Sequence, residues 1–140
     1  MKYSFWVIIA LAGGIIFLSC SAKNTKFDQY YAQGQVLYEK NCGNCHQKNG
    51  KGLGLVYPPL AENNYFSDHL DESFCEMKYG KKGSILVNGK EYNKAMPGVP
   101  SLTELEIAEI ATYLNNSWGR ENGMVEIQRV KQALEKCSAP

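Results

Sequence analysis

Two cysteines and a histidine stand close together in the segment Cys42-Gly43-Asn44-Cys45-His46. A C-x-x-C-H sequence is typical of a haem attachment site. Cysteines three positions apart can bond covalently to the two vinyl groups on one edge of a haem. The adjacent histidine then lies under the ring and offers an imidazole nitrogen to the iron. The motif therefore predicts one covalent haem c held by Cys42 and Cys45, with His46 as an iron ligand.

The same residues permit other chemistry. A redox-active C-x-x-C is expected near a βαβ pattern, which this sequence lacks. A disulfide between Cys42 and Cys45 would close a small loop and stabilise the fold little. A structural zinc site is the stronger rival, because Cys75 could join Cys42, Cys45 and His46 in tetrahedral ligation. The motif alone leaves these alternatives open, and the flanking sequence favours haem.

The first 19 residues predict an export signal. A short positive start is followed by an apolar run from Tyr3 to Leu18, which is short for a bilayer span. The run ends in Phe17-Leu18-Ser19-Cys20, which resembles a bacterial lipoprotein box, where cleavage before the cysteine precedes its acylation. We expect residues 1–19 to be a signal peptide and Cys20 to be lipidated. An uncleaved anchor is the alternative, and both place the remaining chain outside the cytoplasm, on the periplasmic side of a bacterial membrane.

The rest of the chain is expected to form one domain. We expect residues 20–28 to be a flexible tether and residues 29–140 to be the folded domain. Lys2 is the one charged residue before Cys20, so the mature chain has 14 basic and 14 acidic residues and a formal net charge of about 0. This balance gives no reason to expect a nucleic-acid partner.

From about Tyr30 to Gly119 the chain resembles the mono-haem, class I cytochrome c family. Gly34 and Tyr38 match a glycine and an aromatic residue one turn apart in the helix that precedes the haem motif. In the family, the last helix crosses at this glycine, and Tyr113 matches the aromatic residue of that last helix. The resemblance implies an all-α, cytochrome c-like domain wrapped around one haem.

The resemblance also implies the surroundings of the iron. Met96 precedes a proline, as the family's ligand methionine does, so it is expected to be the second iron ligand. Pro59, with Pro58 as the alternative, is expected to accept a hydrogen bond from the second imidazole nitrogen through its carbonyl. Tyr57 and Tyr113 are expected to contact the haem.

The alternative second ligand is His69, the only other histidine in the chain. A bis-histidine site would have a lower reduction potential than a histidine–methionine site. We expect His69 to be solvated instead, because it lies in an acidic stretch.

Two segments go beyond the smallest family members. Asn88-Gly89 lies between short apolar runs, which predicts a small β-hairpin over residues 84–92, placed over one haem edge. The chain after Gly119 has apolar residues at helical spacing, which predict an extra amphipathic helix packed on the domain. They are Met124, Ile127, Val130, Leu134 and Cys137.

Two cysteines remain once Cys20 is assigned to lipid and the motif cysteines to haem. In an oxidising compartment, the remaining Cys75 and Cys137 favour a disulfide. Two separately buried thiols are the alternative. The disulfide would also remove Cys75 from the zinc site considered above.

Charges are unevenly distributed along the chain. Residues 78–94 contain five lysines, Lys78, Lys81, Lys82, Lys90 and Lys94, and one acid, Glu91. Residues 62–76 contain five acids, Glu62, Asp68, Asp71, Glu72 and Glu76, and neither lysine nor arginine. A solvated surface is the ordinary explanation. The alternative hypothesis is that the lysines steer an acidic redox partner toward the haem edge.

These observations predict an electron-transfer protein rather than an enzyme, because His46 and Met96 would fill both axial positions of the iron. It would pass single electrons between respiratory or dehydrogenase partners while tethered to the membrane, as a monomer unless it is a complex subunit. One alternative is an electron-accepting subunit of a quinoprotein dehydrogenase or oxidase complex. The helix that ends in residues 116–119 resembles the corresponding helix of cytochromes linked to quinoprotein dehydrogenases. The other is a haem enzyme or gas-binding protein with a labile sixth ligand.

Overall fold

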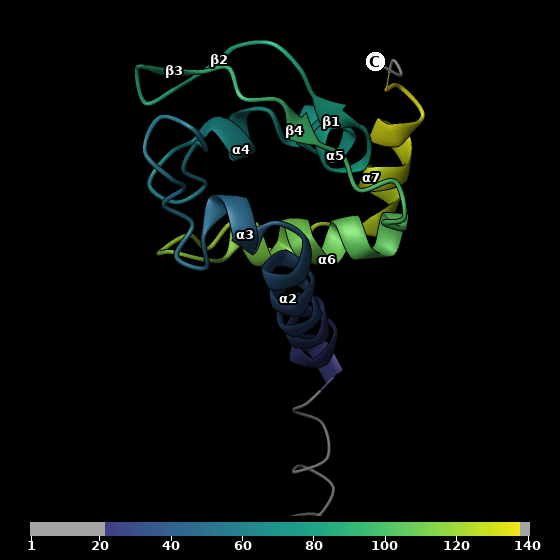
Figure 1. Ribbon diagram of the computed structural model, residues 1–140. Coiled ribbons are helices and arrows are strands. Elements are labelled where there is room, and N and C mark those ends of the chain that lie inside the picture. The colour runs from purple at the N-terminus through teal and green to yellow at the C-terminus, as the bar shows by residue number, and fades with distance from the viewer. Residues whose placement is uncertain (1–21, 138–140) are drawn as a thin grey trace, which may run out of the picture.

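A computed structural model describes residues 22–137, so the predicted signal peptide and Cys20 lie outside the described residues (Figure 1). Most of its regular structure is helical. The helices are α2 (Ala22–Asn41), α3 (Gly43–His46), α4 (Tyr65–Asp68), α5 (Leu70–Tyr79), α6 (Glu104–Asn115) and α7 (Ile127–Leu134). Within residues 22–137, none of these helices has the length and hydropathy of a membrane span.

Two short antiparallel strand pairs complete the fold. Strand β2 (Ile85–Val87) pairs with β3 (Lys90–Tyr92), and β1 (Gly80–Lys81) pairs with β4 (Met96–Pro97). The turn between β2 and β3 is the predicted Asn88-Gly89, whose φ angles of 51° and 72° suit a tight hairpin. The predicted helical domain with a small hairpin is therefore confirmed, and the β1–β4 pair is an addition that the sequence did not reveal.

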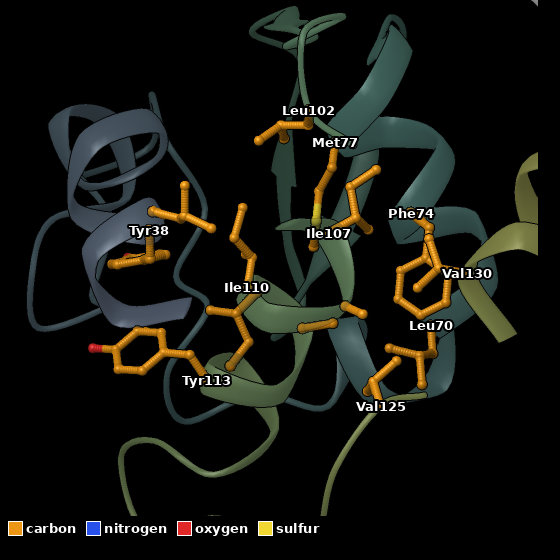
Figure 2. Close-up of a cluster of buried hydrophobic side chains, with 14 of the residues drawn as sticks. Tyr38, Leu70, Phe74, Met77, Leu102, Ile107, Ile110, Tyr113, Val125 and Val130 are labelled. Atoms are coloured by element: carbon orange, nitrogen blue, oxygen red, sulfur yellow. The ribbon is translucent and has the colours of Figure 1, made fainter. Parts of the chain in front are cut away.

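Helices α2 and α6 cross at Gly34. A Cβ atom built on Gly34 would lie well inside 3.0 Å of the Glu109 backbone oxygen on α6, so a larger residue cannot occupy this position without displacement. Beside the crossing, Tyr38 on α2 is fully buried, and its ring centroid is 5.3 Å from that of Tyr113 on α6. Figure 2 shows Tyr113 next to Tyr38, at one end of the buried cluster.

Helix α6 begins with a capping box. The Thr103 hydroxyl accepts a hydrogen bond from the Glu106 backbone N–H, and the Glu106 carboxylate accepts one from the Thr103 backbone N–H. Its two side-chain bonds satisfy backbone donors that a helix start otherwise leaves free. From this start, α6 places Ile107 and Ile110 in the core, where both are fully buried.

Helix α2 starts earlier than predicted. It begins at Ala22, so most of the segment expected to be a flexible tether is helical in the structure. Several contacts lie near the start of this helix. The Lys26 ammonium lies 2.9 Å from the Glu126 carboxylate and 5.5 Å from the centroid of the Tyr30 ring, and Phe27 stacks on Tyr31.

The extra C-terminal helix is present and packs on α5. Val130 on α7 is fully buried and lies beside Phe74 of α5 (Figure 2). A disulfide joins Cys75 on α5 to Cys137 just after α7, the pair that remained after the other cysteines were assigned. By closing a loop across a sequence separation of 62, such a bond restricts the unfolded chain and stabilises the fold by roughly 4 kcal/mol.

The buried face of this C-terminal segment differs from the predicted one. Ile127 is exposed, and Met124 precedes the helix. Helical spacing does not apply there, because the chain from Met124 to Glu126 is not helical. Val125 is buried in place of Met124, and its N–H donates to the Thr112 hydroxyl at 3.0 Å.

The crossing at Gly34 generates a stability prediction. Gly34→Ala adds a methyl group where no space exists, and we expect it to lower the free energy of unfolding by about 1–3 kcal/mol, although alanine favours helix. Chemical denaturation measures this change. Gln35→Ala, at an exposed position on the same helix, is the control and should not destabilise. Equal stabilities for wild type and Gly34→Ala would contradict the close crossing.

Candidate haem site

The motif residues line one cavity. Its empty space, counting its opening to solvent, is about 820 Å³. The lining includes the three motif residues Cys42, Cys45 and His46. It also includes Met96, which lies 50 residues after His46 in the sequence. A second hollow adjoins it, lined by His46 and Met96 and by deeper apolar residues including Phe66 and Leu114.

The haem motif is held at the end of helix α2. The Cys42 N–H donates to the Tyr38 carbonyl at 2.8 Å, and the His46 N–H donates to the Cys42 carbonyl at 3.0 Å. On the other side, the Gly52 N–H donates to the His46 carbonyl at 3.0 Å. These backbone bonds connect the motif to α2 and to the loop that follows it, so the crossing at Gly34 also positions the motif.

The imidazole of His46 is suited to binding a metal. The side chain is buried, and Nδ1 lies 3.0 Å from the Pro58 carbonyl oxygen. A carbonyl only accepts, so Nδ1 is the protonated donor and Nε2 keeps the lone pair that a metal needs. Burial lowers the pKa of His46, while the bond to Pro58 opposes this shift. The neutral form, which ligates metals, is favoured.

The proline partner corrects the expectation for Pro59. Pro58, the alternative, provides the carbonyl that binds His46. The Pro59 carbonyl instead accepts a hydrogen bond from the Asn63 amide at 2.5 Å. Two adjacent prolines offer two carbonyls that point in different directions, and the sequence does not specify which one meets the imidazole.

The thiols of Cys42 and Cys45 are both free. No disulfide joins them, so the disulfide alternative is wrong. Burial raises the pKa of the Cys42 thiol to about 12. Cys75, the fourth ligand of the zinc alternative, is bonded to Cys137. This disulfide removes the fourth ligand that the zinc alternative needs.

Met96 is held against the end of α5 by the β1–β4 pair. Lys81 on β1 is in register with Met96 on β4. A Cβ atom on Gly80 would lie 2.6 Å from the Met96 carbonyl oxygen, and one on Gly98 would lie equally close to backbone atoms of Gly80. The two glycines therefore allow the backbones to approach closely. In the sequence, Gly80 and Gly98 were the signal that could have predicted the β1–β4 strand pair.

The two tyrosines expected to contact the haem have different positions. Tyr57 lines the cavity, and an interaction with the Cys45 thiol raises the pKa of its hydroxyl. Tyr113 is not among the residues that line the cavity or its adjoining hollow. It packs between Tyr31, Tyr38 and Trp118, with ring centroids 5.3 to 5.9 Å away. The helix crossing thus uses this side chain, and its expected contact with the haem stays a prediction.

His69 does not face the cavity. It is exposed, as expected, and its ring centroid lies 4.7 Å from that of Tyr65. Met77, in contrast, was not predicted to be at the site. It is buried on α5 and lines both hollows. In a sequence, a methionine on a helix is usually interpreted as a residue of the hydrophobic core. No sequence pattern therefore distinguished Met77 from a core residue.

The lining as a whole fits a covalently attached haem. Apolar side chains surround the thiols of the motif, the His46 imidazole and the Met96 thioether. The hairpin contributes Ile85 and Tyr92 to this wall. Thiols for covalent attachment, a nitrogen ligand, a sulfur ligand and an apolar enclosure are the groups that a haem c requires.

Comparisons with known proteins agree with this chemistry. The family described as Cytochrome c matches residues 31–118. Cytochrome c-552 from Thermus thermophilus is 32% identical over 98 residues, covering 63% of this chain and 70% of that protein. The cytochrome c subunit of a quinone alcohol dehydrogenase from Gluconobacter oxydans is 30% identical over 111 residues, covering 76% of this chain. The cytochrome subunit of a fructose dehydrogenase from Gluconobacter japonicus is 30% identical over 107 residues, covering 71% of this chain. The chain spans only 23% and 21% of the length of these two subunits.

Proposed function

The chain belongs to the cytochrome c family of electron carriers with covalently attached haem c, and we propose that it transfers single electrons through one haem held by Cys42, Cys45, His46 and Met96. The observation that carries this proposal is the shared cavity, in which both motif cysteines, the imidazole and the thioether meet. When bound, the haem supplies one-electron chemistry between the ferrous and ferric states of its iron.

The residues that would hold the haem suit this site to electron transfer. Cys42 and Cys45 prevent loss of the cofactor, and Pro58 fixes the orientation of His46 through its hydrogen bond. Met96 would provide the second ligand of the iron, which would leave substrates and gases no open coordination site. Histidine–methionine ligation raises the reduction potential. This arrangement supports electron transfer over the alternative of a haem enzyme or gas binder.

The role of Met96 can be tested by substitution. In the ferric protein, we expect the weak far-red absorption band that accompanies methionine ligation in this family. Met96→Ala should lose this band, lower the reduction potential and bind CO rapidly, because it opens the sixth position. Absorption spectra of the purified protein in both redox states measure these changes. Met77→Leu, at the other methionine of the cavity, is the matched control and should keep the band. Rapid CO binding by the wild type, or an unchanged spectrum in Met96→Ala, would contradict the assignment.

We also propose that the carrier is exported and anchored through lipid on Cys20, as the lipoprotein-type start of the chain indicates. The anchor would hold the cytochrome near membrane dehydrogenases and oxidases, which raises its local concentration at these partners. Two matched relatives are cytochrome subunits of dehydrogenases. Their names support the second candidate function, a subunit of such a complex.

Membrane fractionation tests the anchor and separates the two candidates. Wild type should sediment with membranes and, in mild detergent, migrate as a free monomer. Cys20→Ala should lose both the acylation and the cleavage at this position, because both require the cysteine. Recovery of the wild type in the soluble fraction without lipid would contradict the anchor. Co-migration of the wild type with a dehydrogenase in native membranes would favour the subunit over the free carrier.

For its partner, we propose an acidic redox protein that meets the lysines near Met96. Two of the five lysines are already engaged. Lys78 donates to the Pro100 and Leu102 carbonyls, and Lys81 pairs with Glu76. Lys82, Lys90 and Lys94 are exposed, and none of them has an ion-pair partner within residues 22–137. These three lysines are therefore the ones that could act on an approaching partner.

The steering proposal predicts a dependence on salt. Lys90→Gln with Lys94→Gln should slow electron transfer to the native partner by roughly 3–10-fold at low ionic strength, and the difference should shrink as salt screens the charges. Stopped-flow kinetics over a salt series measures this effect. Lys131→Gln with Lys136→Gln removes the same charge from an exposed C-terminal surface and is the control. A wild-type rate that does not depend on ionic strength would refute steering.

A further inference from the structure

A charged pair lies in the wall of the haem cavity. The Glu76 carboxylate accepts hydrogen bonds from the Lys81 ammonium at 2.7 Å and from the Tyr65 hydroxyl at 3.3 Å. Glu76 lines both the main cavity and its adjoining hollow, and Lys81 lines the main cavity. Nothing in attachment or ligation of the haem requires this pair.

The pair is the most enclosed ion pair within residues 22–137. The Glu76 side chain is 14% exposed and the Lys81 side chain is 37% exposed. In the other four pairs at least one side chain is more than half exposed, as in Lys26–Glu126 at 54% and 56%. Enclosing two charges costs desolvation free energy, and an apolar pair of similar volume is often at least as stable. Stability alone therefore does not explain why charges occupy this wall.

The position of the pair connects it to the proposed iron ligand. Glu76 lies on α5, one turn before the strand pair begins, and Lys81 lies on β1 opposite Met96. The same strand pair is packed tightly through Gly80. Both charges thus belong to backbone elements that also hold Met96.

We propose that Glu76 and Lys81 tune the reduction potential of the haem in opposite directions, so that losing either charge alone shifts this potential. This inference rests on the proposed function. Oxidation adds one positive charge to the haem site. In a poorly polarisable wall, the Glu76 carboxylate stabilises that added charge and the Lys81 ammonium opposes it. Held 2.7 Å apart, the two charges have effects on the potential that largely cancel while both partners are present.

Tyr65 gives the carboxylate a second, neutral donor. Its side chain lines the adjoining hollow. Burial, followed by the nearby Glu76 charge, raises the pKa of the Tyr65 hydroxyl, which therefore stays protonated and able to donate. Two donors restrain the Glu76 carboxylate at a fixed place in the wall, where its effect on the haem is reproducible.

Two neutralising variants of the loaded protein test the inference by equilibrium redox titration. Glu76→Gln leaves the ammonium uncompensated and should raise the potential, and Lys81→Gln leaves the carboxylate uncompensated and should lower it. Each should change the equilibrium constant for reduction by a fixed donor on the order of tenfold. The double variant should lie between the two single variants. Glu126→Gln and Lys26→Gln, at an exposed pair, are matched controls and should leave the potential unchanged.

A merely structural role would give a different pattern. If the pair only anchors β1 to α5, both neutral variants lower thermal stability and their potentials shift in the same direction or not at all, which overturns the inference. The charge-keeping variants Glu76→Asp and Lys81→Arg should retain the wild-type potential even if they lose stability. A shift in them as large as in the neutral variants also overturns it. A wild type without a reversible haem couple would instead defeat the proposed function.

Discussion

The close crossing of α2 and α6 at Gly34 is the constraint on which the haem site depends. The motif begins directly after α2 and is bonded back to it through the Tyr38 carbonyl. The direction of α2 therefore determines where both cysteines and His46 lie. Since α6 supplies Ile107 and Ile110 to the core, the crossing places the motif beside an apolar interior. A haem bound there is enclosed by residues that exclude water, which is one control on its potential.

The other half of the site is built by a separate set of contacts. Met96 reaches the cavity because β4 pairs with β1 at the end of α5, and α5 is joined to the C-terminal segment by the Cys75–Cys137 disulfide. Packing of Val130 of α7 against α5 supports the same side (Figure 2). The proposed iron ligands, from two distant parts of the sequence, therefore line one cavity, each held by its own support. The Glu76–Lys81 pair lies on this second support.

Features with a strong local pattern could be predicted from the sequence. The C-x-x-C-H motif, the Asn88-Gly89 turn and the C-terminal helix each depend on neighbouring residues, and the structure has the turn and the helix where expected. Features that depend on direction or tertiary contact could not. Choosing Pro58 over Pro59 requires knowing where a carbonyl points. The position of Tyr113 and the start of α2 depend on side chains far apart in the sequence, which no local pattern specifies.

The central claim is that the cavity holds one haem bonded to Cys42 and Cys45. Intact mass spectrometry of the denatured protein, followed by peptide mapping, tests it most directly. The account predicts a mass equal to the polypeptide plus one haem, with the added mass on the single peptide that contains Cys42, Cys45 and His46. A polypeptide mass without haem, with both cysteines open to alkylation, would contradict it.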